Sequence, residues 1–307
     1  MGREQFGKDA LSFFEERGVE EAYCVFCGKS QSSFILFQKS KALTISRCKK
    51  CGFVYNKTQP DSNALREFYS SSSPMKSWAD LKDNPAELEK QKEKFMPAIL
   101  KLKNLNIKKV LDVGCGNGYF LHLLKEEMPK IEMFGTELNK DAEKVACLKH
   151  GITINPHYSE MNNFDLISFW GVIEHVKDPI RTLQEASQWL SPGGYILVCV
   201  PNVNSEAARI LWKDAFMYCP QHLWYFDRNT LEAVVEKAGL TQVDSFTVEP
   251  EARPILRRSL LFSPYLNDPE VDDFVSRYFD QQAFEKTEEL IKHLDVGYKI
   301  VSLSMKA

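Results

Sequence analysis

The sequence predicts an α/β protein with a mostly parallel sheet, preceded by a small module that holds four cysteines. From residue 108 onward, apolar strand patterns alternate with helical patterns, as expected for a parallel sheet covered on both faces. A glycine-rich turn follows the first strand, and two Cys-x2-Cys pairs lie near the N-terminus. We therefore expect a cysteine module over 20–58, a helical connector or cap over 61–107, and the α/β domain over 108–307 with an insertion at about 250–295.

The expected elements follow from periodicity and from turn residues. Four core strands are expected, at Val110 to Val113, Met133 to Glu137, Leu166 to Trp170 and Tyr195 to Val200. Helices are expected at Tyr119 to Glu127, Lys140 to His150, Pro179 to Leu190 and Arg228 to Ala238. Two last strands, Gln242 to Glu249 and Tyr298 to Met305, enclose helical patterns at Asp268 to Asp280 and Ala283 to Leu294. In the connector, we expect a break at Ser70 to Pro74 and a helix start at Pro85.

Composition narrows the classes of function. The 307 residues are 44% hydrophobic and 26% charged, with a net charge of −3, which is ordinary for a globular protein and disfavours a nucleic-acid partner. No segment approaches the roughly 20 apolar residues that span a bilayer, and the charged N-terminus does not resemble a secretory signal. Because tight cysteine pairs fit a reducing compartment, we expect a cytoplasmic protein.

The glycine turn is the first candidate binding feature. Gly114, Gly116 and Gly118 separate an apolar strand from an apolar helix, and glycines there let the backbone approach a ligand, although such turns also occur without one. Glu137 follows the last glycine by 19 positions, where a carboxylate can accept hydrogen bonds from both ribose hydroxyls of an adenosine. The third glycine comes one residue earlier than in dinucleotide sites, and Asp112 would repel a diphosphate, so a cationic ligand is favoured.

These residues resemble the class I S-adenosylmethionine-dependent methyltransferases, whose first motif is similar to residues 111–118. The resemblance continues in three ordered motifs, Phe164 to Ile167, Glu174 to Pro179 and Leu190 to Gly194. It implies a Rossmann-like sheet of seven strands with S-adenosylmethionine as cofactor. The residues it places at the cofactor are Asp112, Gly114, Cys115, Gly116 and Gly118 near the methionine part, Glu137 at the ribose, Leu138 beside the adenine, and Trp170 and Gly171 at the sulfonium. His157 and Tyr158 are expected near the adenine.

Two histidines are candidates for a base at the methyl acceptor. His175 follows the fourth motif strand, where ligands gather in open α/β sheets, and an imidazole there can equally have a structural role. His222 and Tyr225 lie in a run that resembles the His-x-x-Tyr-Phe segment of zinc-ribbon methyltransferases acting on nucleotide sugars and related small molecules. The sugar C-methylating branch has Glu before this His, whereas Gln221 stands here. Gln cannot act as a base, which favours O- or N-methylation. The alternative is that these aromatic residues simply fill a core.

The four N-terminal cysteines are candidate metal ligands. Twenty residues separate the pair Cys24 and Cys27 from the pair Cys48 and Cys51, and glycine follows each pair. Four thiolates at this spacing fit a tetrahedral zinc ion with no open position, so the zinc is expected to be structural. Two disulfides are the alternative, which a reducing compartment disfavours. The resemblance implies that the module packs over the acceptor site, while its lysines leave contact with RNA as an alternative.

The sequence therefore predicts an enzyme that methylates an oxygen or nitrogen of a small metabolite, such as a sugar, glycan or lipid-linked precursor. One alternative is an RNA- or protein-modifying methyltransferase whose zinc module docks the substrate. Another is an inactive S-adenosylmethionine-binding scaffold, which the complete glycine turn and Glu137 disfavour.

Overall fold

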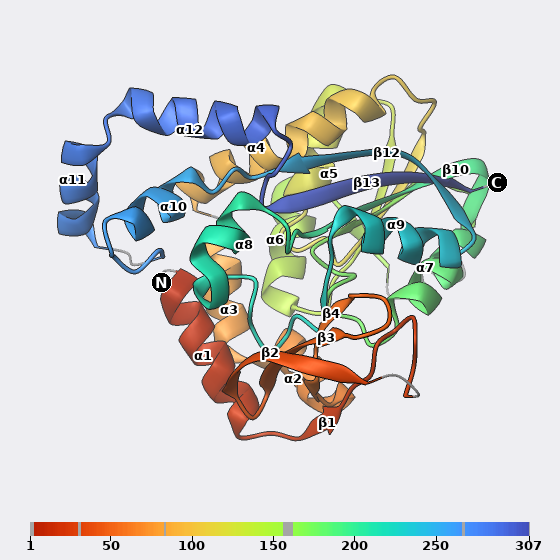
Figure 1. Ribbon diagram of the computed structural model, residues 1–307. Coiled ribbons are helices and arrows are strands. Elements are labelled where there is room, and N and C mark those ends of the chain that lie inside the picture. The colour runs from red at the N-terminus through yellow and green to blue at the C-terminus, as the bar shows by residue number, and fades with distance from the viewer. Residues whose placement is uncertain (1–2, 30–31, 83, 156–161, 266–267, 307) are drawn as a thin grey trace. The chain divides into compact units, whose positions relative to one another are not determined.

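The structure is a computed structural model that describes residues 3–29, 32–82, 84–155, 162–265 and 268–306 (Figure 1). The chain forms two compact units. The first, which we name the ribbon unit, comprises Met1–Ala64, Pro201–Asp227 and Phe246–Ile300. The second, the sheet unit, comprises Leu65–Val200, Arg228–Ser245 and Val301–Ala307.

A seven-stranded sheet of order β12-β13-β10-β9-β6-β7-β8 belongs mostly to the sheet unit. Its first five strands along the chain pair in parallel, as the alternating pattern predicts. The strand β10 begins five residues earlier than expected, and the register shift between Leu190 and Tyr195 is accommodated by Gly193 in a left-handed conformation. The strands are β6 (Lys109–Val113), β7 (Glu132–Thr136), β8 (Thr153–Ile154), β9 (Phe164–Trp170), β10 (Leu190–Pro201), β12 (Leu240–Val248) and β13 (Lys299–Lys306).

Two helices of the sheet unit, α4 and α6, have caps that the sequence encodes locally. Asn84 accepts a hydrogen bond from the backbone N–H of Ala86, and Pro85 follows it as the first residue of α4. Asn139 caps the start of α6, and Gly151 ends it in a left-handed conformation. The helices are α2 (Ser62–Ser71), α3 (Ser73–Lys82), α4 (Pro85–Leu102), α5 (Tyr119–Glu127), α6 (Lys140–His150), α7 (Pro179–Gln188) and α9 (Arg228–Lys237). The predicted connector break and the predicted bounds of α5 and α6 are confirmed.

Within the described residues, the ribbon unit contains two antiparallel sheets and five helices of more than one turn. The strand β1 (Val19–Glu21) pairs with β5 (Thr58–Pro60). The larger sheet has the order β11-β4-β3-β2, from β2 (Ser33–Ser40), β3 (Leu43–Cys48), β4 (Val54–Asn56) and β11 (Trp224–Tyr225). The helices are α1 (Arg3–Glu15), α8 (Glu206–Leu211), α10 (Ala252–Ser259), α11 (Pro269–Tyr278) and α12 (Gln281–His293). In the part of the chain that the structure describes, no helix has the length and apolar character required to cross a membrane.

A long-range pairing joins the cysteine module to the segment after residue 201. The strand β11 pairs with β4, with Trp224 opposite Tyr55 and Tyr225 opposite Val54. The fully buried Asn56 donates its backbone N–H to the carbonyl of Leu223 at 2.9 Å. This pairing fixes the segment that carries His222 and Tyr225 to the cysteine module within the ribbon unit.

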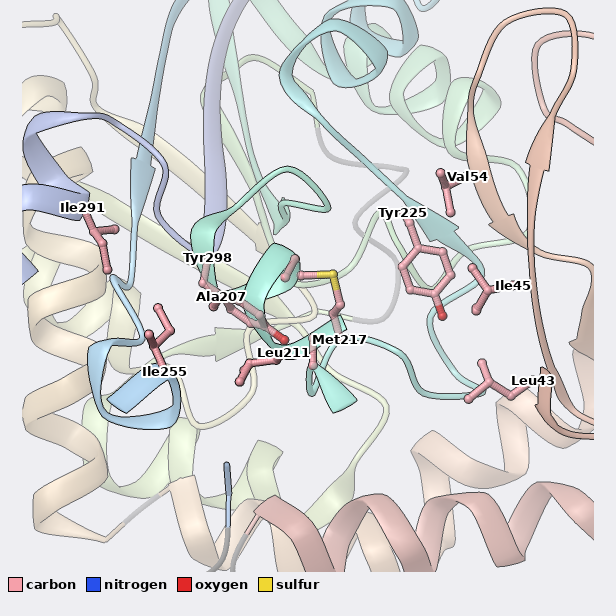
Figure 2. Packing of buried hydrophobic residues seen from close by; sticks show 12 residues of the cluster. Leu43, Ile45, Val54, Ala207, Leu211, Met217, Tyr225, Ile255, Ile291 and Tyr298 are labelled. Atoms are coloured by element: carbon pink, nitrogen blue, oxygen red, sulfur yellow. The ribbon is translucent and has the colours of Figure 1, made fainter. Parts of the chain in front are cut away.

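The core of the ribbon unit combines residues from all three of its chain segments. Figure 2 shows Ile45 and Val54 of the ribbon strands beside Tyr225, with Leu211, Met217 and Ile255 in the same cluster. Trp224, Tyr225 and Phe226 are each less than 5% exposed. The aromatic run is therefore part of this core, which was one of the two interpretations of the sequence.

Candidate functional site

The glycine turn after β6 has a backbone conformation that favours glycine at three positions. Gly114, Gly116 and Gly118 have φ values of 70°, 56° and 78°, in the left-handed region that favours glycine. A Cβ on Gly118 would lie 2.9 Å from Cγ1 of Ile152, whereas a Cβ on Gly116 would meet nothing within 4 Å. The turn is thus closely packed on its α6 side and borders open space at Gly116.

Glu137 immediately follows β7 and is held against this turn. Its Oε2 accepts a hydrogen bond from the Gly116 N–H at 2.8 Å, and its Oε1 accepts from the N–H groups of Leu138 and Asn139, both at 2.8 Å. Burial raises the pKa of Glu137, and these three donors oppose that rise. Because a carboxylate has about four acceptor positions, the side chain is oriented and keeps acceptor capacity for a ribose hydroxyl.

Asp112 is the second carboxyl group at this edge of the sheet, and unlike Glu137 it is fully buried. It is 1% exposed, and its Oδ1 accepts a hydrogen bond from Ser168 Oγ at 2.7 Å. Burial raises the pKa of Asp112 to about 7, the Glu137 charge adds to that rise, and the Ser168 hydroxyl and Lys94 oppose it. A buried group with this pKa ionises readily once a cation arrives, which suits the ammonium of an amino-acid ligand.

Trp170 ends β9 in the same sheet unit, and Gly171 follows it. The Trp170 ring packs against Phe95 at 4.7 Å and Phe120 at 5.0 Å between ring centroids. Its buried Nε1–H has no acceptor among the residues that the structure describes. Gly171 is left-handed and donates its N–H to Cys199. A buried donor of this kind fits a polar ligand atom.

The remaining predicted cofactor residues differ in exposure. Cys115 is buried in the turn, and its N–H bonds the carbonyl of Thr136 at 2.9 Å. Leu138 is 57% exposed, next to Glu137. His157 and Tyr158 lie outside the described residues. The residues of the sheet unit therefore combine two carboxylates, an open glycine turn and a buried indole donor, a set that fits the adenosine and amino-acid ends of S-adenosylmethionine.

The four module cysteines come together in the ribbon unit. Their sulfur atoms all lie within 4.8 Å of one another, and Cys24 Sγ is 3.4 Å from Cys51 Sγ. Zinc–sulfur bonds of about 2.3 Å place tetrahedral sulfurs about 3.8 Å apart. All four cysteines are free, so the disulfide alternative is not adopted.

Each Cys-x2-Cys pair forms a tight turn that directs N–H groups at sulfur. Gly28 and Gly52 end the turns in left-handed conformations and donate their N–H groups to the carbonyls of Cys24 and Cys48. Burial raises the pKa values of Cys24 and Cys27. Burial also opposes ionisation of Cys48, but backbone donors from Cys51 and Lys50, together with hydrogen bonds from neighbouring thiols, lower its pKa to about 7. Such donors stabilise a thiolate, which is the form that binds metal.

A family model described as a methyltransferase domain matches residues 80–245. This range covers more than half of the chain and includes the glycine turn, Glu137 and Trp170. The chain belongs to this methyltransferase family. The predicted class I fold of S-adenosylmethionine-dependent methyltransferases is thereby confirmed.

Two relatives of this methyltransferase differ in the acceptor that their names state. A ubiquinone biosynthesis O-methyltransferase of Proteus mirabilis is 32% identical over 113 residues, which are 33% of this chain and 44% of that protein. A tRNA U34 carboxymethyltransferase of Trichodesmium erythraeum is 23% identical over 181 residues, 55% of this chain and 54% of that protein. The chain thus matches about half the length of these curated relatives.

Solved structures show the same fold at low identity. A chain in the complex of the Haloferax volcanii Trm112 methyltransferase activator with a methyltransferase has a TM-score of 0.51 and 14% identity, over 75% of this chain and 96% of that chain. The mitomycin 7-O-methyltransferase MmcR has a TM-score of 0.52 and 12% identity, over 79% of this chain and 60% of that chain. At these identities the likeness concerns the fold alone.

His175 of the methyltransferase lies in a polar group of the sheet unit. Its Nδ1 is 2.7 Å from the Tyr69 hydroxyl, on α2 of the connector. The neighbouring Glu174 is 1% exposed, with Oε1 3.9 Å from His175 Nε2. The Oε2 atom of Glu174 is buried and has no hydrogen-bond partner within the described ranges.

His222 and Tyr225 lie in the ribbon unit, on the segment that pairs with β4. His222 Nδ1 is 2.7 Å from the carbonyl oxygen of Met217. Because a carbonyl only accepts, Nδ1 carries the proton and Nε2 of the neutral ring has a lone pair. The Tyr225 hydroxyl donates to the Cys219 carbonyl at 3.2 Å, and burial raises the pKa of Tyr225 well above its ordinary value. Tyr225 is therefore held in its neutral form, and its predicted catalytic role stays a prediction.

Three residues at this site come from the connector and carry no sequence motif. Tyr69, Lys94 and Phe95 lie on helices α2 and α4 and contact His175 or Trp170. Glu87, Gln91 and Lys94, spaced by four and three positions, are buried polar residues on one face of α4. These polar residues on one face of α4 were the feature of the sequence that could have indicated a contribution of this helix to the site.

Proposed function

We propose that this protein transfers the methyl group of S-adenosylmethionine to an oxygen or nitrogen of a small metabolite. The observation that carries the proposal is the pair of carboxyl groups beside the glycine turn: the buried Asp112 near the end of β6 and the partly buried Glu137 directly after the neighbouring parallel strand β7. Asp112 complements the ammonium of the cofactor, and Glu137 accepts from the ribose. When bound, the cofactor supplies an electrophilic methyl group on a sulfonium.

A hydroxyl of a sugar, glycan, small phenol or lipid-linked precursor is the acceptor in this proposal. A relative named as an O-methyltransferase supports transfer to oxygen. Gln221 supports it as well, because it stands where a base for C-methylation would be needed. Membership of the nucleotide-sugar branch is part of the proposal and rests on the His222-x-x-Tyr225 segment and on its pairing with the cysteine module.

A hydroxyl acceptor loses its proton as it is methylated, and His175 is the base that we assign to this step. The Tyr69 hydroxyl lies 2.7 Å from Nδ1 of His175. This step uses the tautomer in which Nδ1 carries the proton and Nε2 has the lone pair that accepts the acceptor's proton. The acceptor oxygen forms the new bond to the methyl carbon, the carbon–sulfur bond breaks, and the proton ends on His175. The carboxylate of Glu174 stabilises the positive charge that results.

His222 is a second candidate base, because the Met217 carbonyl fixes its ring with Nε2 unprotonated. The variants His175→Gln and His222→Gln separate the two. The variant that lacks the base is expected to lose about 100-fold or more in turnover and to keep its affinity for S-adenosylhomocysteine. A variant that loses both properties together would indicate a structural role for that histidine.

Cys24, Cys27, Cys48 and Cys51 hold a structural zinc ion in this proposal. Four thiolates leave no coordination position for water or substrate, so the ion has no direct part in the chemistry. Its proposed role is to stabilise the ribbon, and through the β4–β11 pairing the segment that carries His222.

An RNA substrate is the second candidate function. A relative named as a tRNA U34 carboxymethyltransferase and the exposed side chains of Lys41, Arg47, Lys49 and Lys50 on the cysteine module favour it. Charge reversal at Lys49 and Lys50 is expected to abolish turnover on tRNA and to leave cofactor affinity unchanged. Unchanged turnover on tRNA would exclude docking through the module.

The decisive test is calorimetric titration with S-adenosylmethionine and S-adenosylhomocysteine. Glu137→Gln is expected to weaken both by about 10- to 100-fold, the range for a lost hydrogen bond to a charged group. Glu132→Gln is the matched control, because Glu132 is exposed at the other end of β7. Absence of binding to the unmodified protein would overturn the proposal and leave a scaffold without this cofactor.

The acceptor class is tested next with radiolabelled S-adenosylmethionine and three acceptors: a catechol, a nucleotide sugar and tRNA. Label in a small acceptor, lost in His175→Gln, supports the proposal. Label in tRNA alone would establish the second candidate.

A further inference from the structure

The helix α4 carries a charged side chain into the interior of the sheet unit. Lys94 is 9% exposed, on the same face of α4 as Glu87 and Gln91. Lysine is rarely buried to this extent without a specific electrostatic role. The predicted cofactor motifs do not include Lys94, and the proposed chemistry does not use it.

The surroundings of Lys94 place it near the carboxyl ends of the central strands. Its Nζ lies 4.3 Å from the Phe95 ring centroid and 5.9 Å from that of Trp170, the last residue of β9. The charge of Lys94 acts on Asp112, whose pKa it lowers against the effect of burial. The geometry therefore places one buried cation beside Trp170, the last residue of the strand that pairs with the strand of Asp112.

The amino-acid end of S-adenosylmethionine carries an ammonium and a carboxylate. Asp112 complements the ammonium, but a carboxylate placed beside Asp112 and Glu137 would be repelled by both. A buried ammonium at Trp170 removes that repulsion and supplies donors for a charge-assisted hydrogen bond. The two charges of the ligand then face two opposite charges of the protein.

We infer that Lys94 binds the carboxylate of the methionine part of S-adenosylmethionine, so that the connector helix α4 supplies a cofactor-binding residue. This inference rests on the proposed function, because it requires the cofactor to occupy the turn at 114–118. The competing interpretation is that Lys94 only offsets the charge of the buried Asp112 in the ligand-free protein.

A comparison of three ligands separates these interpretations by calorimetry. S-adenosylhomocysteine has both charged groups, its decarboxylated analogue keeps only the amine, and 5′-methylthioadenosine has neither. For the unmodified protein, loss of the ligand carboxylate is expected to weaken binding by about 10- to 100-fold. In Lys94→Met, the affinity for S-adenosylhomocysteine falls to that of the decarboxylated analogue, and the affinity for methylthioadenosine stays within about twofold.

Lys90→Met is the matched control, because Lys90 is an exposed lysine about one turn earlier on α4. Lys94→Gln repeats the test if Lys94→Met does not fold. Equal weakening of all three ligands, or unchanged discrimination between the first two, would overturn the inference while leaving the proposed function intact. Failure of the unmodified protein to bind S-adenosylhomocysteine would instead overturn the proposed function, and with it this inference.

Discussion

Replacement of Asp112 by Asn is expected to stabilise the ligand-free protein at alkaline pH and to impair cofactor binding. The two side chains have nearly the same shape, and Asn keeps an Oδ1 that accepts the hydrogen bond from Ser168. The substitution removes only the ability of the buried group to ionise. The role that we propose for Asp112 requires an ionised carboxylate, whereas its burial disfavours that charge.

The size of the effect follows from proton linkage. Burial raises the pKa of Asp112 to about 7 in the folded protein, while the unfolded chain has an ordinary value of about 3.9. Between these pH values the folded state holds a proton that the unfolded state has released, so the free energy of unfolding falls as pH rises. The stabilisation is fully present below about pH 4 and is lost by about pH 7, a change of about 4 kcal/mol at 1.36 kcal/mol for each pH unit.

Urea unfolding of the unmodified protein and of Asp112→Asn at pH 4.5 and pH 8.5, without cofactor, measures this effect. Raising the pH from 4.5 to 8.5 is expected to lower the unfolding free energy of the unmodified protein, relative to that of the variant, by about 3 kcal/mol. Asp80→Asn, at an exposed position of α3, is the control and should show no such movement. At pH 8.5 the variant is also expected to bind S-adenosylhomocysteine more weakly by at least about tenfold.

Two results would refute the reasoning. A pH-independent difference between the two proteins would mean that burial does not hold Asp112 protonated near neutrality. Undiminished affinity of the variant for S-adenosylhomocysteine would mean that Asp112 does not complement the ligand ammonium.

Three further predictions concern the zinc, the base and the turn. Cys24→Ser is expected to lose the zinc found by metal analysis and to increase the solvent exposure of Trp224 in fluorescence quenching, whereas the exposed Cys147→Ser should change neither. Tyr69→Phe removes the hydroxyl beside His175. It should lower turnover by about tenfold or more and shift the pH profile of turnover, with no change in the affinity for S-adenosylhomocysteine. An unchanged pH profile would exclude a positioning role for Tyr69. Gly118→Ala places a Cβ 2.9 Å from Ile152 at φ 78° and should reduce stability in urea by about 2 kcal/mol or more, whereas Gly7→Ala, in open surroundings on α1, should not be destabilising.

The parts of the fold that the sequence predicts are those encoded by neighbouring residues. Helix α6 begins and ends where Asn139 and Gly151 provide its caps, so its bounds follow from local chemistry. The helix α10 was not predicted, because its N-cap Glu251 makes no side-chain cap and Pro254 interrupts the pattern. The division into domains at residue 108 and the packing of the module over the acceptor site stay predictions.

The long-range contacts could not be predicted from one sequence. Strand β11 has two residues, and its partner β4 lies about 170 positions earlier in the chain. No local propensity defines so short a strand; the pairing exists because Asn56 and Tyr55 offer hydrogen-bond partners to it. The same is true of Tyr69 and His175, which meet across 106 positions.

The residues of the candidate site also fall into two groups, those encoded by a local motif and those that come from distant helices. Asp112, the glycine turn and Glu137 are encoded by a motif because a close backbone approach and a ribose contact need fixed spacings along one strand–turn–helix unit. Lys94 and Tyr69 come from connector helices, where a charged or phenolic side chain can reach the site from many positions. We therefore expect substitutions of Tyr69 on α2 to affect the methyl-acceptor step and substitutions of Lys94 on α4 to affect cofactor affinity, in both cases without loss of the fold.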